Sequence, residues 1–203
     1  VIRTHMTQLA EAGVDFIIVD HTFMNAARTT IEYEWDVYVG DPCTVLLDTI
    51  VEMRAEGKKT PYVVFWSGSF SETGWAVVER LYRDIYSVQK WKDCFVYWEG
   101  NLFQLLTRTP STPMSGMNLT VREMWGLEQN LGAEKWSFLQ HLNEPIKSYD
   151  GYTEQMCVCT AAQRSYMSKK SAQGREHGIF MYTQWYNAFQ YRPKIVTITW
   201  WNE

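Results

Sequence analysis

Carboxylates, amides and indoles gather at the ends of the short apolar runs of this sequence. In chain order these residues are Asp20, His21, Trp66, Trp98, Glu99, Gln140, His141, Glu144, Gln163, Trp200, Trp201, Asn202 and Glu203. Amides and carboxylates hydrogen-bond sugar hydroxyls, and an indole ring stacks on the C–H face of a sugar. Cleavage of a glycosidic bond takes two carboxyl groups, one as the acid and one as the base or nucleophile. The pattern therefore favours carbohydrate chemistry.

Two kinds of element, amphipathic helices and short buried strands, must position these residues. Apolar spacing predicts helices over Ile2–Ala12, Asp41 through Met53, Trp75 through Ile85, Thr120 through Leu131 and Ile179 through Phe189. Runs rich in β-branched and aromatic residues predict strands over Val14–Asp20, Pro61–Trp66, Cys94–Glu99, Trp136–Gln140, Met156–Ala161 and Ile195–Trp201, with Leu102–Thr107 as a hairpin arm.

Local signals set several helix ends. Asp41 is expected to cap a helix that carries Pro42 in its first turn, and Gly57 ends it. Thr120 and Glu123 have the spacing of a capping box, which predicts the start of another helix.

Near-continuous apolar strands joined by helices indicate a parallel sheet covered on both faces. A doubly wound open sheet and a (β/α)8 barrel both satisfy this pattern. No glycine-rich phosphate-binding motif follows any strand, so we favour the barrel. We predict an α/β fold, a TIM-type barrel incomplete in this chain, with residues 1–203 as a single catalytic-type domain. In a barrel the carboxyl ends of the strands form one rim, where substrates are handled.

Each of these residues also has a simpler interpretation. A single carboxylate after a strand is more often a loop residue or a helix cap. Glu144 precedes Pro145 and can sit in a turn. The indoles of Trp66, Trp98 and Trp200 can fill the core instead of contacting a sugar. The carbohydrate hypothesis therefore depends on the joint pattern.

Three stretches resemble a known group of enzymes. They are Ala12–Asp20 (AGVDFIIVD), Pro61–Trp66 (PYVVFW) and Ile198–Glu203 (ITWWNE). Together they resemble glycoside hydrolases of the endo-α-mannosidase-like barrel group, families seventy-one and ninety-nine. The Trp-Asn-Glu stretch is the most specific of the three.

The resemblance implies that Val14–Asp20 is the second barrel strand and Ile195–Trp201 the seventh, so that the first and eighth strands would lie outside this sequence. It also implies that Glu203 is a functional carboxylate. The group's second acidic residue would follow a few positions beyond Glu203, so Glu99 and Glu144 are chosen as alternative partners by position alone. We expect the other polar and aromatic residues named above to bind the substrate.

The composition limits the classes of partner that we expect for this chain. The formal net charge is -4, and the 19 basic residues are scattered, which disfavours nucleic acid. The apolar runs are too short for a membrane span.

The four histidines lack the spacing of a zinc site, so we expect neither a metal nor a cofactor. No CxxC pair occurs among Cys43, Cys94, Cys157 and Cys159, which are expected to be buried thiols. Asn118 lies in a glycosylation triplet, which favours a secreted or extracellular protein.

Two alternatives stay open. The same barrel can serve as a non-catalytic carbohydrate-binding or structural protein, because fold does not fix function. A barrel lyase or aldolase is disfavoured, because Lys135 and Lys194 precede their strands and so would lie at the wrong end.

Overall fold

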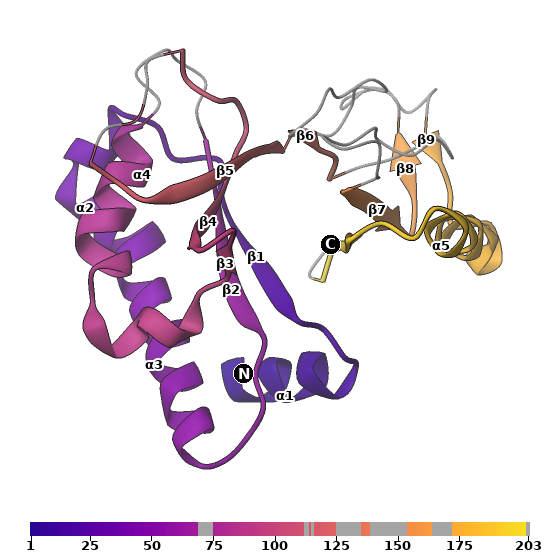
Figure 1. The fold of residues 1–203 in the computed structure, drawn as a ribbon, viewed down its shortest axis with the longest axis horizontal. Helices are drawn as coiled ribbons and strands as arrows, with labels where there is room; N and C mark the ends of the chain where they lie inside the picture. Colours follow the sequence, from indigo (N-terminus) through magenta and orange to yellow (C-terminus); the bar gives the residue numbers. More distant parts are fainter. Residues whose placement is uncertain are drawn as a thin grey trace. The chain divides into compact units, whose positions relative to one another are not determined.

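The computed structural model describes residues 1–68, 75–111, 114, 116–124, 135–138, 154–163 and 172–201. These residues belong to two compact units, 1–121 and 122–203, and each unit is described by itself (Figure 1).

The first unit alternates helices and strands. Its elements are α1 (Ile2–Glu11), β1 (Phe16–His21), η1 (Arg28–Thr30), α2 (Glu32–Trp35), η2 (Asp36–Gly40), α3 (Asp41–Ala55), β2 (Tyr62–Ser67), α4 (Ala76–Leu81), η3 (Tyr82–Tyr86), η4 (Gln89–Cys94), β3 (Tyr97–Trp98), β4 (Asn101–Leu106) and β5 (Leu119–Met124). The three helices predicted before residue 90 and the first two predicted strands are thereby confirmed.

The predicted cap of α3 is wrong. Asp41 makes no capping hydrogen bond, because the π-helical turn η2 runs directly into α3 and leaves Gly40 as the preceding residue. Pro42 lies in the first turn of α3, as predicted.

The strands β1, β2 and β4 are parallel neighbours in the sheet. Asp20 pairs with Trp66 and His21 with Ser67, while Ser67 pairs with Leu106 of β4. The carboxyl ends of the three strands therefore coincide at one edge.

Register also fixes which side chains share a face, because paired residues of parallel strands point the same way. Val63 and Phe65 belong to the core cluster that includes residues of α3 and α4, and Ile17 and Val19 pack against it. The side chains that alternate with these along β1 and β2, including those of Asp20 and Trp66, point to the opposite face of the sheet.

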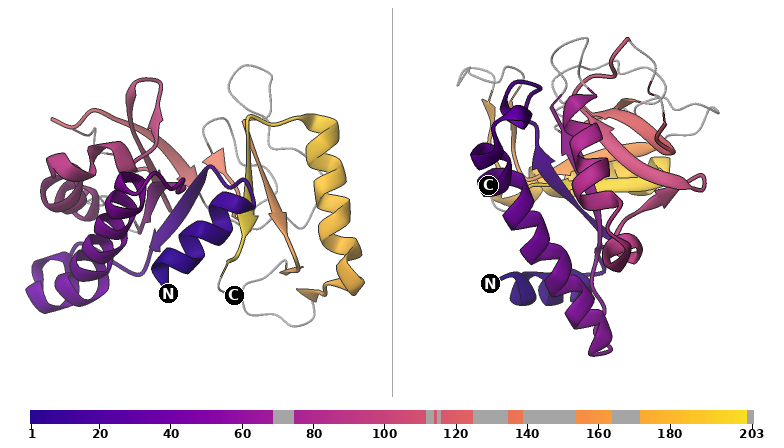
Figure 2. Two further views of the ribbon diagram at one scale, coloured as in Figure 1. Left: turned by 90° about the horizontal axis from the view of Figure 1, so that it is seen from below. Right: turned by 90° about the vertical axis from the view of Figure 1, so that its left-hand side faces the viewer.

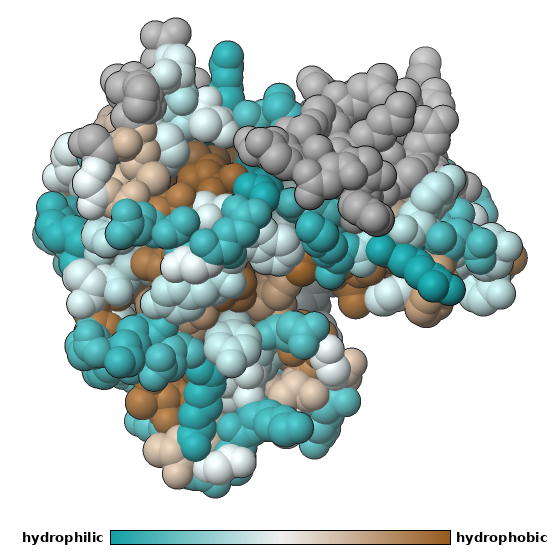
Figure 3. Space-filling model, viewed as in Figure 1, coloured by the Kyte–Doolittle hydropathy of each residue, from teal (hydrophilic) through white to brown (hydrophobic). Residues whose placement is uncertain are grey.

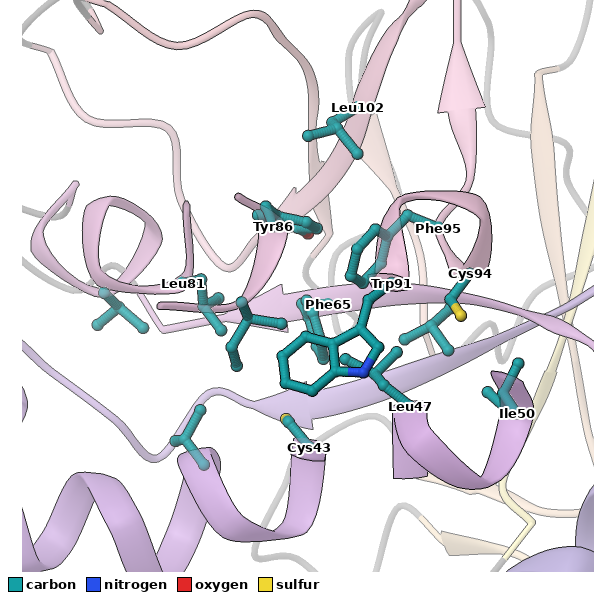
Figure 4. Packing of buried hydrophobic residues seen from close by; sticks show 14 of the residues in the cluster. Cys43, Leu47, Ile50, Phe65, Leu81, Tyr86, Trp91, Cys94, Phe95 and Leu102 are labelled. Carbon is teal, nitrogen blue, oxygen red and sulfur yellow. The ribbon is translucent and has the colours of Figure 1, made fainter. Parts of the chain in front are cut away.

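The core of the first unit lies between these strands and their helices. It contains Leu47 and Ile50 of α3, Phe65 of β2 and Leu81 of α4, all fully buried (Figure 4). Each such side chain contributes about 1.5–3 kcal/mol by leaving water. Hydrophilic side chains cover most of the visible face of this unit (Figure 3).

Two predicted elements of the first unit are wrong. The predicted strand Cys94–Glu99 is reduced to Tyr97–Trp98, which pairs antiparallel with β4, and β4 takes its place in the parallel sheet. The run from Thr120 to Met124 begins no helix but lies within the strand β5, where Thr120 and Met124 are buried and alternate with half-buried neighbours. The rest of this predicted helix, residues 125–131, lies outside the described residues.

The second unit contains the end of β5 and a separate parallel pair. Its elements are β6 (Lys135–Trp136), β7 (Gln155–Cys159), β8 (Ala162–Gln163), β9 (Ala172–Gln173), η6 (Glu176–Gly178), α5 (Ile179–Tyr191) and β10 (Ile195–Thr199). β7 and β10 are parallel, and β5 pairs in parallel with β6. The helix α5 lies along β7, where Phe180 packs on Cys157 and Cys159 (Figure 2). The predicted helix from Ile179 and the strands at β7 and β10 are confirmed.

The chain is thus a mixed α/β protein with parallel strand pairing, compatible with an incomplete α/β barrel. None of the helices in the described ranges combines the length and apolar character that a membrane span requires.

Candidate functional site

The carboxyl-end edge of β1 and β2 carries the best-defined part of the candidate site. Asp20 is exposed there, and its Oδ1 accepts a hydrogen bond of 2.7 Å from the backbone N–H of Thr22. This bond fixes one carboxylate oxygen at the turn and leaves Asp20 where the sequence predicted it, able to accept hydrogen bonds from a ligand.

Trp66 pairs with Asp20 across the two strands, but it is not available to a ligand. Its side chain is only 2% exposed, so the indole belongs to the interior. The prediction that Trp66 stacks on a sugar is wrong in this structure, because the ring is buried.

His21 also differs from its predicted role as a rim hydrogen-bonder. The ring faces the helices, stacks on Phe65 at a centroid distance of 5.3 Å and places Nε2 3.7 Å from the Sγ of Cys43. Burial lowers the pKa of His21 to about 4 and raises the pKa of Cys43 to about 12, so both groups are neutral at pH 7. Nδ1 of His21 is buried with no hydrogen-bond partner among the described residues.

The buried side-chain amide of Gln104 links β2 and β4 near their carboxyl ends, on the face of the sheet that packs against the helices. Gln104 accepts a hydrogen bond of 2.9 Å from the hydroxyl of Tyr86 and donates to the carbonyl of Phe65 and the hydroxyl of Ser67. Because buried polar groups cost free energy when unpaired, this network makes the edge rigid.

Three residues that the sequence analysis missed extend the site outward from β1. The ring of Phe23 lies 6.3 Å from that of His21 and 5.8 Å from that of Tyr38, edge-on in both cases. The guanidinium of Arg28 lies 5.7 Å from each of the Phe23 and Tyr38 rings and forms an ion pair with Glu34. The sequence carries one signal for Phe23, because this residue follows Asp20, at the end of a predicted strand, by only three positions.

The turn that presents Phe23 is locked against β2. The N–H of Met24 donates to the carbonyl of His21 at 3.0 Å, which closes the turn. A Cβ on Gly68 would come within 2.2 Å of the carbonyl oxygen of Thr22, so only glycine permits this approach.

Glu99 and Trp98 lie at the other end of the sheet. They belong to the β3–β4 hairpin, where Trp98 pairs with Asn101 and Glu99 has the left-handed backbone of a turn residue (φ 54°). Asn101 precedes Leu105, the residue beside Trp66, by four positions, which is about 13 Å along a strand. The prediction that Trp98 and Glu99 share an edge with Asp20 is therefore wrong, because the parallel strand is β4 and these residues precede it.

In the second unit, the parallel pair β7–β10 positions the Trp-Asn-Glu stretch. Thr199 pairs with Cys159 at the carboxyl end of both strands, and Trp200 follows with its ring 5.5 Å from that of Phe138. Trp201 is 56% exposed. The chain thus leaves this strand end with one indole half-buried and the next accessible.

Buried side chains of β7 and β10 form polar contacts with one another among the residues that precede this carboxyl end. Gln155 donates to the hydroxyl of Thr197 at 2.7 Å, and the Sγ of Cys157 lies 3.2 Å from the hydroxyl of Thr199. The Sγ atoms of Cys157 and Cys159 are 3.3 Å apart, on one face as their spacing predicts. These buried contacts hold the strand end in place.

A buried ion pair supports the start of β7. Glu154 accepts bonds of 2.7 and 3.0 Å from Arg122 and one of 2.6 Å from the indole N–H of Trp136. Burial alone would raise the pKa of Glu154, but the hydrogen bonds from Arg122 and Trp136 and the charge of Arg122 outweigh it, so the pKa lies below its ordinary value. This carboxylate is fully engaged as a structural ion.

The remaining predicted residues are placed only in part. Gln163 lies in β8, whose backbone pairs with β9 beyond the end of β7. Gln140, His141, Glu144, Asn202 and Glu203 lie outside the described residues. Across the described parts of the chain, no three His, Cys, Asp or Glu side chains gather as metal ligands.

Comparisons with known proteins give no family assignment. No family model matches the chain, and neither a curated protein nor a solved structure matches it.

Proposed function

We propose that this chain carries the catalytic residues of a glycoside hydrolase that cleaves an oligo- or polysaccharide, on a (β/α)8 barrel. Glu203 is the acid/base or nucleophile, and Glu99 or Glu144 is its partner. Asp20 holds sugar hydroxyls, Trp200 and Trp201 offer apolar ring surface, and Gln140, His141, Gln163 and Asn202 complete the polar lining. A secreted location, with glycan on the exposed Asn118, belongs to the same proposal.

The parallel register of β7 and β10 is the observation that carries the proposal. It makes Thr199 the carboxyl end of a parallel strand, and Trp200-Trp201-Asn202-Glu203 continues from that end. Carboxyl ends of parallel strands are where α/β barrels and open α/β sheets hold their substrates. The position and the residue types of this stretch therefore agree.

Glu99 and Glu144 are the alternatives for the second carboxylate. Paired carboxyl groups of glycosidases act across about 5–9.5 Å. Glu99→Gln and Glu144→Gln, assayed beside Glu203→Gln, distinguish the two, because only the true partner should lose activity as Glu203→Gln does.

A hydrolysis screen tests the proposal. The full polypeptide is incubated with neutral and acidic glycans, and new reducing ends are measured. We expect turnover of at least one glycan, with a loss of about a hundred-fold or more for Glu203→Gln, since a general acid or base contributes about that much. Glu176→Gln, an exposed acid in η6, is the control and should retain full activity. Equal rates for Glu203→Gln and the parent would remove Glu203 from the mechanism.

A non-catalytic carbohydrate-binding protein is the second candidate. The exposed Asp20 and the exposed rings of Phe23 and Tyr38 favour this function, since both offer sugar contacts in a unit that needs no second carboxylate. Glycan affinity without any release of reducing ends would support it over the hydrolase.

A further inference from the structure

We propose that Phe23 and Tyr38, with Arg28, form a stacking subsite for a neutral sugar ring. The inference rests on the proposed carbohydrate function and names a site for it in the first unit. The three residues lie between the end of β1 and the start of α3.

The two rings are accessible, which separates them from the buried aromatics around them. Phe23 is 43% exposed and Tyr38 47% exposed. Their edge-on contact presents two ring surfaces at an angle, 77° between planes. An exposed aromatic pair of this kind gives apolar faces for sugar C–H groups at little entropic cost, because each ring has few rotatable bonds.

The pair is held in place before any ligand arrives. A continuous series of ring contacts runs from Phe65 in the core through His21 to Phe23 and Tyr38. Arg28 lies against both exposed rings and donates from Nη1 to the carbonyl of Phe23 at 3.1 Å. A preorganised surface loses less entropy on binding, which favours a specific ligand over incidental contact.

A polar group for sugar hydroxyls stands beside the rings. The Nε group of Arg28 donates to Glu34, and Nη1 donates to the carbonyl of Phe23. Among the described residues, Nη2 has no hydrogen-bond acceptor, so it is available to a sugar hydroxyl. A donor thus lies next to an apolar surface, a combination that suits a sugar.

The charges favour a neutral sugar over an acidic one. Glu34 neutralises Arg28 in their ion pair, so the guanidinium beside the rings carries no uncompensated positive charge. A uronic acid or phosphate would have to displace Glu34 to reach the guanidinium.

Affinity measurements with defined oligosaccharides test the subsite. The probes are the neutral tetrasaccharides of glucose, mannose and xylose and, for charge, tetragalacturonate, with affinity measured by calorimetry and ring contact by saturation-transfer NMR. We expect Tyr38→Ala and Phe23→Ala each to weaken binding of the best neutral probe about ten-fold, or about 1.4 kcal/mol. Tetragalacturonate should bind more weakly than the neutral probes.

Tyr62→Ala is the matched control. Tyr62 is also 47% exposed and lies under an arginine, with Arg54 4.7 Å from the ring centroid, but it begins β2 at the opposite edge of the sheet. Its removal should leave affinity unchanged. Gly68→Ala, which keeps both rings but displaces the turn, should weaken binding as the ring deletions do.

The failures of the two proposals are distinguishable. If the parent hydrolyses a glycan and loses that activity with Glu203→Gln, while Tyr38→Ala and Phe23→Ala bind as tightly as Tyr62→Ala, the subsite is refuted and the hydrolase stands. If no neutral probe binds the parent, the subsite is refuted directly. If binding falls with Tyr38→Ala but no glycan is hydrolysed, the subsite stands and the hydrolase fails.

Discussion

The buried ring of His21 should make the first unit lose stability as the pH falls from neutral. Burial lowers the pKa of His21 from 6.5 to about 4, so the unfolded chain takes up a proton at a pH where the folded chain does not. The stability is fully present above about pH 6.5 and is lost progressively below it, levelling off near pH 4. Each pKa unit corresponds to about 1.4 kcal/mol, which gives about 3 kcal/mol in all and about 2 kcal/mol by about pH 5.

The assay compares urea unfolding of the parent and His21→Phe at about pH 8, 6 and 5, with a probe in the first unit such as the buried Trp35. The substitution keeps a ring against Phe65 and removes the titrating group. Any constant packing cost cancels, because only the change with pH is compared. The parent should lose about 2 kcal/mol more than the variant between about pH 8 and pH 5. Equal losses would show that His21 is not held neutral by burial.

Two further predictions concern stability and thiol reactivity. Arg122→Met should lower the free energy of unfolding by about 3–5 kcal/mol, because it leaves Glu154 buried without its charged partner, and the double variant Arg122→Met/Glu154→Leu should recover part of this loss in urea titrations. A double variant no more stable than the single one would contradict this. The four cysteines are buried, and burial raises the pKa of Cys43, Cys94 and Cys157, so Ellman's reagent should label them only on unfolding. Rapid labelling of the native chain would show that the thiols are accessible.

Much of the fold follows from periodicity. The helices α1, α3 and α5 and the strands β1, β2 and β10 lie where apolar spacing and glycine stops predict them. The errors have a common cause, since short segments satisfy two patterns at once. The capping-box letters of Thr120 and Glu123 also fit an alternating strand, and β5 forms because its alternate side chains are buried.

The site prediction is wrong at the β3–β4 hairpin for the same reason, since two neighbouring segments there satisfy one pattern. CFVYWE and LFQLL are both apolar runs, and only pairing partners decide that β4 joins β2 in parallel while β3 is the antiparallel arm. For that reason the sequence places Glu99 at the wrong edge of the sheet.

The face that a strand residue adopts is equally hidden from sequence. Asp20 and His21 are neighbours, yet one is exposed and the other lies among Phe65, Phe23 and Cys43. Phe23 and Tyr38 could not be paired from sequence, because their contact depends on how the turn after β1 and the helical turns before α3 fold together.

Glycan turnover by the parent, Glu203→Gln and Glu176→Gln is the most direct test of the central claim, which is that the carboxylate following β10 performs the chemistry. With the most reactive neutral glycan, the rate of reducing-end release should fall about a hundred-fold or more for Glu203→Gln alone, while Glu176→Gln matches the parent. An undiminished rate in Glu203→Gln, or the absence of hydrolysis from every glycan tested with the parent, would contradict the account.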